Sequence, residues 1–253
     1  MTALAGRVAL VTGSSRGIGS AIARLFARHG AAVAVHGRDR AALAAVRGDI
    51  EAAGARALDV AADVTRFDEI EAMRHYVERE LGPIDVLVAN AGASLTHPHL
   101  PIEEITEEGW RASVDANLTA TFLTVKSVLP GMKERRRGSI VTMSSAAARR
   151  PSGLSPIPYT AAKAGIQALT QCAAAQAGPF GVRVNCIAPE TILTERNEEQ
   201  IPPAVQTKLA EEHPVRRLGA PDDVAQAALF LASDASAWIT GVVLDVAGGA
   251  VMR

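Results

Sequence analysis

Tyr159 and Lys163 stand four residues apart in the stretch SPIPYTAAKAGIQ, residues 155 to 167. On a helix, side chains at this spacing share one face, so a phenol and an ammonium would lie close together. Bringing a phenol pKa from about 10 to about 7, where it exchanges a proton with a carbonyl or alcohol, requires about 4 kcal/mol. An ammonium about 5 Å away supplies about 3 kcal/mol, and a helix N-terminus adds about 0.3–1 kcal/mol. The pair is therefore a candidate acid/base, although the same spacing is typical of a half-buried ring beside a solvated amine.

The composition is typical of a globular protein, and the basic residues are not clustered as they would be for binding a large anionic partner. The 253 residues are 48% hydrophobic, which is enough for one α/β domain, and the net charge is −1 with scattered basic residues. We therefore expect no nucleic-acid or membrane partner. The two cysteines are too few for a disulfide framework or a four-ligand zinc site. The N-terminus lacks a signal-peptide pattern, and no 18-residue apolar stretch occurs, so we expect a cytoplasmic protein.

A glycine-rich turn follows the first apolar run, RVALVTG at residues 7 to 13. Gly13, Gly17 and Gly19 space out this turn before a helical segment begins. Such a turn lets the backbone approach a pyrophosphate, and the helix that follows offers its N-terminal N–H groups. The spacing G-x-x-x-G-x-G differs from the commonest dinucleotide fingerprint, and a plain connection between a strand and a helix is the alternative.

The residues after the second strand bear on the choice of dinucleotide. NAD-binding folds place an acidic residue here to hold the ribose 2′-OH, whereas an arginine accommodates a 2′-phosphate. This chain has Gly37-Arg38, eighteen and nineteen residues past Gly19. Arg38, with Arg16 from the glycine turn, could pair with a phosphate. We expect Asp39 to cap the next helix, and NADP(H) to be preferred over NAD(H).

Strand and helix patterns alternate along the chain, which predicts a parallel sheet covered on both faces and a single domain over residues 1–253. Strands are expected at 7–13, 31–36, 56–65, 84–92, 138–145, 182–190 and 242–248, and helices after the glycine turn and at 40–53, 67–81, about 106–133, 159–177 and 220–233. The polar segment 190–215 is too charged for a core and long enough to be a substrate lid.

Polar residues at the strand exits are candidate ligand contacts. Asp63, before Val64, could accept the adenine amino group or cap the helix that follows, and Asn90-Ala91-Gly92 would let backbone pass beside a ligand. His97 and His99 invite a metal site, but with no third ligand nearby a solvated loop is the better interpretation. We expect no metal.

Together these motifs resemble the short-chain dehydrogenase/reductase family over nearly the whole chain. The matching segments, in family order, are TGSSRGIG at 12–19, Asp63-Val64, NAG at 90–92, Asn117, Ser144-Ser145, YTAAK at 159–163, VNCIAP at 184–189 and ITGVVLDVAGG at 239–249. The resemblance implies a three-layer, doubly wound Rossmann-like fold with a seven-stranded parallel sheet. It also implies a catalytic tetrad of Asn117, Ser145, Tyr159 and Lys163.

The resemblance assigns a role to each of these four residues. In reduction, Tyr159 donates the proton and Ser145 holds the developing oxyanion, while hydride comes from the nicotinamide. Lys163 lowers the pKa of Tyr159 and binds the nicotinamide ribose, and Asn117 positions a water that relays protons. The positions it implies for cofactor binding are Gly13, Ser15, Arg16, Gly17, Ile18, Gly19, Arg38, Asp63, Val64, Asn90, Ala91, Gly92, Tyr159, Lys163, Pro189, Ile192 and Thr194.

Several positions depart from the family pattern. Ser144 competes with Ser145 for the catalytic role because the loop before Tyr159 is one residue longer than usual, and Ser145 is our choice. Glu190 replaces a glycine that normally packs on the nicotinamide, which removes backbone freedom and adds a carboxylate near the site. Among relatives that reduce 3-oxoacyl carrier-protein substrates, two basic residues beside the site entrance grip the carrier. Arg136 matches one such position, but Phe180 occupies the other.

We therefore expect an NADPH-dependent reductase of a small or lipid-like ketone. A 3-oxoacyl-thioester reductase is the enzymatic alternative, and a catalytically silent NADPH-binding regulator is the alternative outside enzymes. The family resemblance also implies a homotetramer, or at least a homodimer.

Overall fold

Short runs of valine, leucine, isoleucine and alanine form the strands, and β1 and β4 are buried along their whole length. In this computed structural model, which describes residues 2–93, 100–151 and 155–252, the strands make one sheet in the order β3-β2-β1-β4-β5-β6-β7. Every neighbouring pair is parallel. The strands are β1 Val8–Val11, β2 Ala32–Gly37, β3 Ala57–Ala61, β4 Val86–Ala89, β5 Gly138–Met143, β6 Val182–Pro189 and β7 Val243–Val246.

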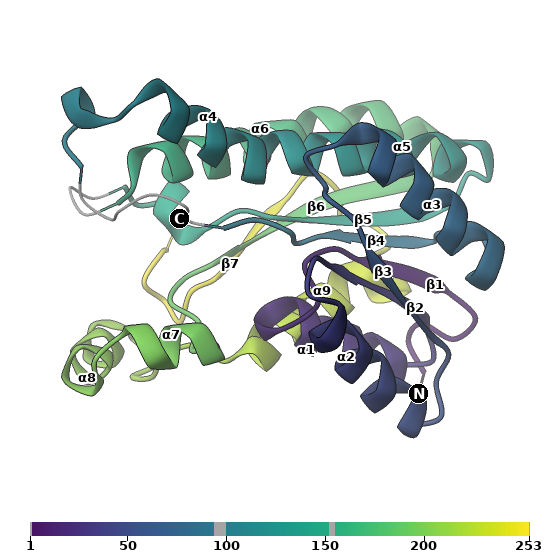
Figure 1. Ribbon diagram of the computed structural model, residues 1–253, viewed down its shortest axis with the longest axis horizontal. Helices are drawn as coiled ribbons and strands as arrows, with labels where there is room; N and C mark the ends of the chain where they lie inside the picture. The colour runs from purple at the N-terminus through teal and green to yellow at the C-terminus, as the bar shows by residue number, and fades with distance from the viewer. Residues whose placement is uncertain (1, 94–99, 152–154, 253) are drawn as a thin grey trace.

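Helices cover both faces of this sheet (Figure 1). They are α1 Gly17–Arg28, α2 Arg40–Ala52, α3 Phe67–Leu81, α4 Glu107–Val114, α5 Ala120–Glu134, α6 Ile157–Ala177, α7 Glu195–Gln200, α8 Pro203–Glu212 and α9 Pro221–Ala232. Helices α1, α2 and α9 lie on one face, and α3, α4, α5 and α6 lie on the other. One apolar core fills each interface, so the predicted doubly wound Rossmann-like fold is confirmed.

The strand order reverses between β1 and β4, whose carboxyl ends are therefore the place where a doubly wound sheet binds its ligand. The glycine turn follows β1, and Asn90 follows β4. Ser145 and Glu190 follow β5 and β6 at the same edge of the sheet. The fold thus gathers the predicted site from segments far apart in the sequence.

The predicted helix over residues 106–133 is wrong in one respect, because it is divided. Helix α4 passes into a π-helical turn over Asp115–Thr119 and then into α5. Asn117 lies in this turn, where its side-chain amide donates to Ser113 O at 2.9 Å and to Ala93 O at 2.8 Å. Single π turns inside α-helices commonly mark functional sites.

The segment proposed as a lid, 190–215, contains two short helices, α7 and α8. Both extend away from the sheet on the side of α1 and α9 (Figure 1). Thr194 caps α7 by accepting a hydrogen bond from Asn197 N. The two histidines of the sequence hypothesis, His97 and His99, lie outside the described residues.

Close packing explains why the glycine turn needs glycines. A Cβ atom on Gly19 would lie 2.2 Å from Gly13 O and 2.7 Å from Asn90 Nδ2, and one on Gly13 would lie 2.8 Å from Ala91 Cα. Gly13 and Gly17 also have positive φ angles of 64° and 56°, a conformation that L side chains rarely adopt. The turn therefore docks against the end of β4 only when these positions have no side chain.

We predict that Gly19→Ala lowers the free energy of unfolding by at least about 2 kcal/mol, because two backbone atoms of the turn, Gly13 O and Ser14 Cα, would have to move. Gly48→Ala is the matched control. Gly48 lies inside α2, and a Cβ atom added there would have nothing within 4 Å, so alanine should stabilise the protein by about 0.5–1 kcal/mol. Urea unfolding of both variants measures the difference. If the two variants were equally stable, the turn would have space for a side chain at Gly19.

Candidate active site

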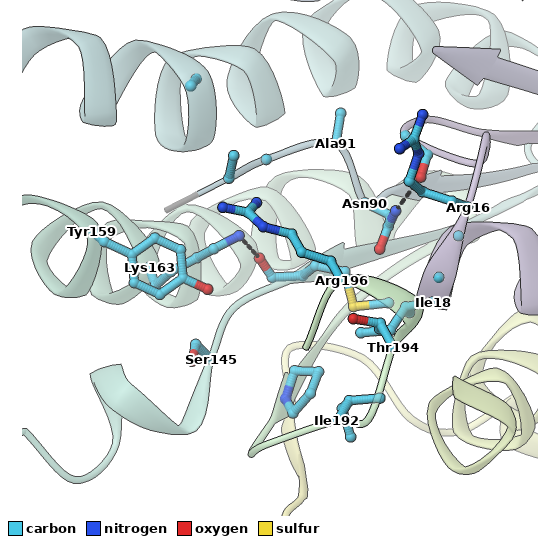
Figure 2. A pocket seen from close by; sticks show the side chains of 18 of the residues that line it. Arg16, Ile18, Asn90, Ala91, Ser145, Tyr159, Lys163, Ile192, Thr194 and Arg196 are labelled. Carbon is cyan, nitrogen blue, oxygen red and sulfur yellow. Dashed lines mark hydrogen bonds between the residues drawn. The ribbon is translucent and has the colours of Figure 1, made fainter. Parts of the chain in front are cut away.

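Tyr159 and Lys163 lie on α6, which packs against β5 and β6. The Lys163 ammonium nitrogen is 5.5 Å from the centroid of the Tyr159 ring and donates a hydrogen bond to Met143 O at 2.9 Å. The Lys163 side chain is buried, with the residue only 4% exposed. The predicted spacing therefore brings the phenol and the amine together in one corner of the cavity (Figure 2).

Burial dominates the titration of both groups. It raises the pKa of Tyr159, and the hydrogen bond with Ser145 opposes that rise. Burial also lowers the pKa of Lys163 to about 8. The expectation that the ammonium brings the phenol pKa down is wrong for the protein alone, because the removal of water penalises both charged forms. Any lowering of the Tyr159 pKa then has to come from the cofactor and substrate that lie against the phenol during the reaction.

The two serines after β5 have different partners. Ser144 Oγ donates to Lys163 O at 2.8 Å and accepts from Gln167 Nε2 at 2.8 Å, which commits it to holding α6 in place. Ser145 hydrogen-bonds with Tyr159 and accepts from Ala147 N at 3.2 Å. Of the two candidates, Ser145 is therefore the one placed beside the phenol.

Asn117 approaches the same corner from the π turn. Its side-chain oxygen is buried and has no hydrogen-bond partner within the described chain. Gly92 keeps the space in front of it open, since a Cβ there would lie 2.6 Å from Asn117 Oδ1 and 3.2 Å from Lys163 Nζ. A buried polar atom without a partner next to an amine is a place where an ordered water fits.

The cavity at this edge of the sheet has a volume of about 850 Å³. Every position that the sequence assigned to the cofactor lines it, as do Ser145 and the two cationic residues Arg150 and Arg196. Asn117 does not line the cavity and lies behind its wall, next to Ala116. The α1 N-terminus and bare glycine backbone face the cavity, so the residues fit a dinucleotide that runs from the glycine turn to Tyr159.

His36 and Asn90 hold the glycine turn, and sequence reasoning missed this role of both. His36 Nδ1 accepts from Gly13 N at 3.2 Å, and Nε2 lies 3.0 Å from Ala62 O. Burial lowers the pKa of His36, which favours the neutral ring that these two contacts require. Asn90 Nδ2 donates to Thr12 O and Gly13 O at 3.0 and 2.9 Å. A histidine at the end of an otherwise apolar strand was the available signal.

The two arginines at the end of the cavity where we expect the adenine are not equivalent. Arg16 pairs with Asp39 at 2.7 Å, while Asp39 also caps α2 by accepting from Ala42 N, as predicted. Arg38 is exposed and forms no ion pair within the described part of the chain. Asp63 accepts from Thr65 N and Oγ1, which lowers its pKa, and it does not cap α3, whose N-cap is Arg66.

Two departures from the family pattern acquire a physical interpretation. The only non-glycine residues with positive φ among those described are Arg136 and Arg216, so Glu190 needs none of the freedom of the glycine it replaces. Its N–H donates to Val246 O at 3.1 Å, and its carboxylate lines the cavity.

Arg136 was expected beside the site entrance. It precedes the amino end of β5, whereas Ser145 follows the carboxyl end, so it lies at the opposite edge of the sheet within one chain.

Neither a membrane-spanning helix nor a metal cluster occurs within residues 2–93, 100–151 and 155–252. No helix in these ranges is long and apolar enough to cross a bilayer. No group of three or more histidine, cysteine, aspartate or glutamate side chains in the same ranges could hold a metal ion.

Comparisons with known proteins extend this picture. A family model described as "Enoyl-(Acyl carrier protein) reductase" matches residues 13–251. The cis-4-hydroxycyclohexanecarboxylate dehydrogenase of Sinomonas cyclohexanicum is 40% identical over 254 residues, covering 98% of this chain and 97% of that one. The 7alpha-hydroxysteroid dehydrogenase of Escherichia coli K12 is 35% identical over 251 residues, covering 99% and 96%.

Solved structures agree with this result. A 3-oxoacyl-[acyl-carrier protein] reductase from Brucella melitensis with bound NAD superposes with a TM-score of 0.90 at 37% identity, covering 100% of this chain and 94% of that one. The chain belongs to the short-chain dehydrogenase/reductase family. It is therefore an oxidoreductase that uses a nicotinamide cofactor and acts on alcohol or carbonyl groups.

The buried lysine predicts a characteristic pH dependence of stability. Between its folded pKa of about 8 and the ordinary value of 10.5, the unfolded chain binds more protons than the folded protein, so stability rises with pH across this window. Below the window the cost of burying the ammonium is present in full. Lys163→Met removes that cost at every pH.

We therefore predict that the free energy of unfolding of the wild type, minus that of Lys163→Met, increases by about 3 kcal/mol as pH rises through this window. Chemical denaturation at a series of pH values measures it. A difference that stays constant with pH would mean that Lys163 titrates as it does in water.

Proposed function

We propose that the protein is an NADPH-dependent oxidoreductase that interconverts a carbonyl and a secondary alcohol, with Tyr159 as the acid/base. The observation that carries the proposal is the meeting of Tyr159, Ser145 and Lys163 in one buried corner of a cavity that all the predicted dinucleotide positions line. A bound nicotinamide supplies or accepts the hydride. The protein itself has to position the substrate oxygen and move one proton.

In the reducing direction, Tyr159 gives its hydroxyl proton to the carbonyl oxygen as negative charge develops there. Ser145, whose hydroxyl lies beside the phenol, donates a hydrogen bond to the same oxygen. The Lys163 ammonium stabilises the phenolate that remains. A water between Asn117 Oδ1 and Lys163 Nζ would return a proton to the pair, and the unpartnered amide oxygen supports this role.

NADP(H) is the cofactor we infer, on the basis of charge at the adenine end. Gly37 offers no carboxylate to a ribose 2′-OH, and Arg38 has a guanidinium that is not committed to any described partner. Arg16 is the weaker contributor because Asp39 already pairs with it at 2.7 Å. The similar Brucella protein is described with bound NAD, so cofactor preference needs a direct test.

Tyr159→Phe should reduce kcat for any accepted carbonyl by at least about a thousandfold, because the ring remains but the proton donor is lost. The Kd for NADPH, measured by fluorescence titration, should change by less than about threefold, since the hydroxyl contributes at most one hydrogen bond to the cofactor. Full activity in this variant would exclude Tyr159 as the proton donor.

Arg38→Leu should raise the KM for NADPH about tenfold or more while leaving the KM for NADH nearly unchanged. Only NADPH has a 2′-phosphate, so only NADPH loses an ionic contact when the guanidinium is removed. Arg40→Leu is the matched control, since Arg40 begins α2 at the exposed surface and does not line the cavity. Equal losses with both cofactors, or an equal effect of the control, would contradict the assigned preference.

A 3-oxoacyl-thioester reductase is the second candidate, supported by the similarity to the Brucella reductase. Its carrier protein would need basic residues near the entrance, and Arg136 lies at the far edge of the sheet, where it donates to Pro179 O at 2.9 Å. Phe180 occupies the other position and stacks under Lys133. The relatives named above act on different alcohols, so the substrate has to come from this chain's own cavity.

The cytoplasmic location and the homotetramer, or homodimer, stay predictions. Large apolar side chains that a single chain leaves exposed favour self-association, among them Phe122 on α5 and Phe230 on α9.

A further inference from the structure

We propose that the substrate carries a carboxylate, which Arg150 and Arg196 bind from opposite walls of the cavity. The inference rests on the proposed function, because it concerns the same site. It adds the chemical class of the substrate, which the reaction mechanism leaves open. It depends on two arginines that have no side-chain partner among the described residues, and on the arrangement of the acidic residues.

Arg150 stands on the wall that also holds Ser145. The short 3₁₀ turn Ala146–Ala148 follows Ser145, and Arg150 N donates to Ala146 O at 2.8 Å, so the backbone of Arg150 is fixed within one turn of the catalytic serine. The neighbouring Arg149 points elsewhere and makes two hydrogen bonds to Asp245 on β7, both at 3.1 Å. One arginine of the pair is thus neutralised, and the other lines the cavity.

Arg196 comes from the opposite wall, in the first turn of α7. The Thr194 cap and the hydrogen bond from Asn197 Nδ2 to Ile192 O, at 2.7 Å, fix the start of that helix. Figure 2 shows the Arg196 side chain extending from the Thr194 side of the cavity toward the side that carries Tyr159 and Lys163. Arg196 therefore faces the half of the cavity where the chemistry takes place.

Neither guanidinium forms an ion pair or a side-chain hydrogen bond with any described residue. The acidic residues that line the same cavity are placed differently. Asp63 is held by Thr65 at the adenine end. Glu195 points toward the glycine turn, with Oε2 3.8 Å from the position of a Gly17 Cβ, and Glu190 accepts from Thr191 Oγ1. When the Glu190 carboxylate is counted in the substrate half, Arg150 and Arg196 still leave an excess of positive charge there.

An arginine fork matches the two oxygens of a carboxylate, and a second guanidinium from the facing wall can share the same charge. The cavity then orients a hydroxy or oxo acid with its carboxylate between the arginines and its reacting carbon at Tyr159. A neutral ketone would gain no ionic contact from the two cations, so charge becomes the basis of selectivity.

The experiment compares 4-hydroxycyclohexanecarboxylate with its carboxamide, which has nearly the same shape and no charge. We expect the wild type to prefer the acid by at least about tenfold in kcat/KM, and Arg150→Met or Arg196→Met to reduce that preference at least about tenfold. The carboxamide rate and the NADP⁺ Kd should stay within about twofold. Arg28→Met, an exposed arginine on α1, is the control and should change nothing.

Calorimetry of cyclohexanecarboxylate, which has no hydroxyl to oxidise, against the protein–NADP⁺ complex gives a second readout, with at least about tenfold weaker binding in each variant. Equal rates on acid and amide in the wild type would overturn the inference and leave the proposed function intact. A rise in the NADP⁺ Kd of Arg196→Met would assign that arginine to the cofactor instead. Preference for a 3-hydroxyacyl-CoA over the simple acid would assign both arginines to phosphates and overturn the inference as well. Loss of turnover on every alcohol, with acid binding retained, would refute only the proposed function.

Discussion

Lys163 has its amine buried away from bulk solvent, and the geometry of the candidate active site follows from the cost of that burial. The residue is 4% exposed, and burial lowers its pKa to about 8. Its ammonium has Met143 O as a hydrogen-bond acceptor at 2.9 Å, and the absence of a side chain on Gly92 keeps the space in front of it free. The Tyr159 ring centroid lies 5.5 Å from this nitrogen, so we expect the phenol and the ammonium to lose their protons in coupled steps.

The fold, and the residues that line the candidate site, were largely predictable from the sequence, because both depend on local patterns. Apolar runs that end in glycine or serine define parallel strands, and the carboxyl ends of such strands meet at one edge of the sheet. The i, i+4 spacing of Tyr159 and Lys163 fixes their relation on α6 whatever the rest of the chain does. Asp39 as a helix cap is likewise a property of a few neighbouring residues.

What could not be predicted depends on contacts between distant segments. The π turn at Asn117 reflects hydrogen bonds to Ser113 and Ala93, and His36 holds the glycine turn through a pairing set by strand register. The direction of the Tyr159 pKa was mistaken because spacing reveals an attractive charge but not the loss of water around both groups. The position of Arg196 on the cavity wall depends on how the chain leaves β6 and begins α7. A short polar segment cannot reveal that.

The coupling of Tyr159 to a buried Lys163 is best tested by the pH dependence of kcat/KM for alcohol oxidation at saturating NADP⁺. Oxidation needs the pair to have lost one proton, so that Tyr159 acts as a base toward the alcohol. We expect log kcat/KM to rise with a slope of one and to level off above an apparent pKa near 8, the value that burial gives Lys163. A rate that is flat or falls from about pH 6 to about pH 9 would show that this pair does not control the reaction.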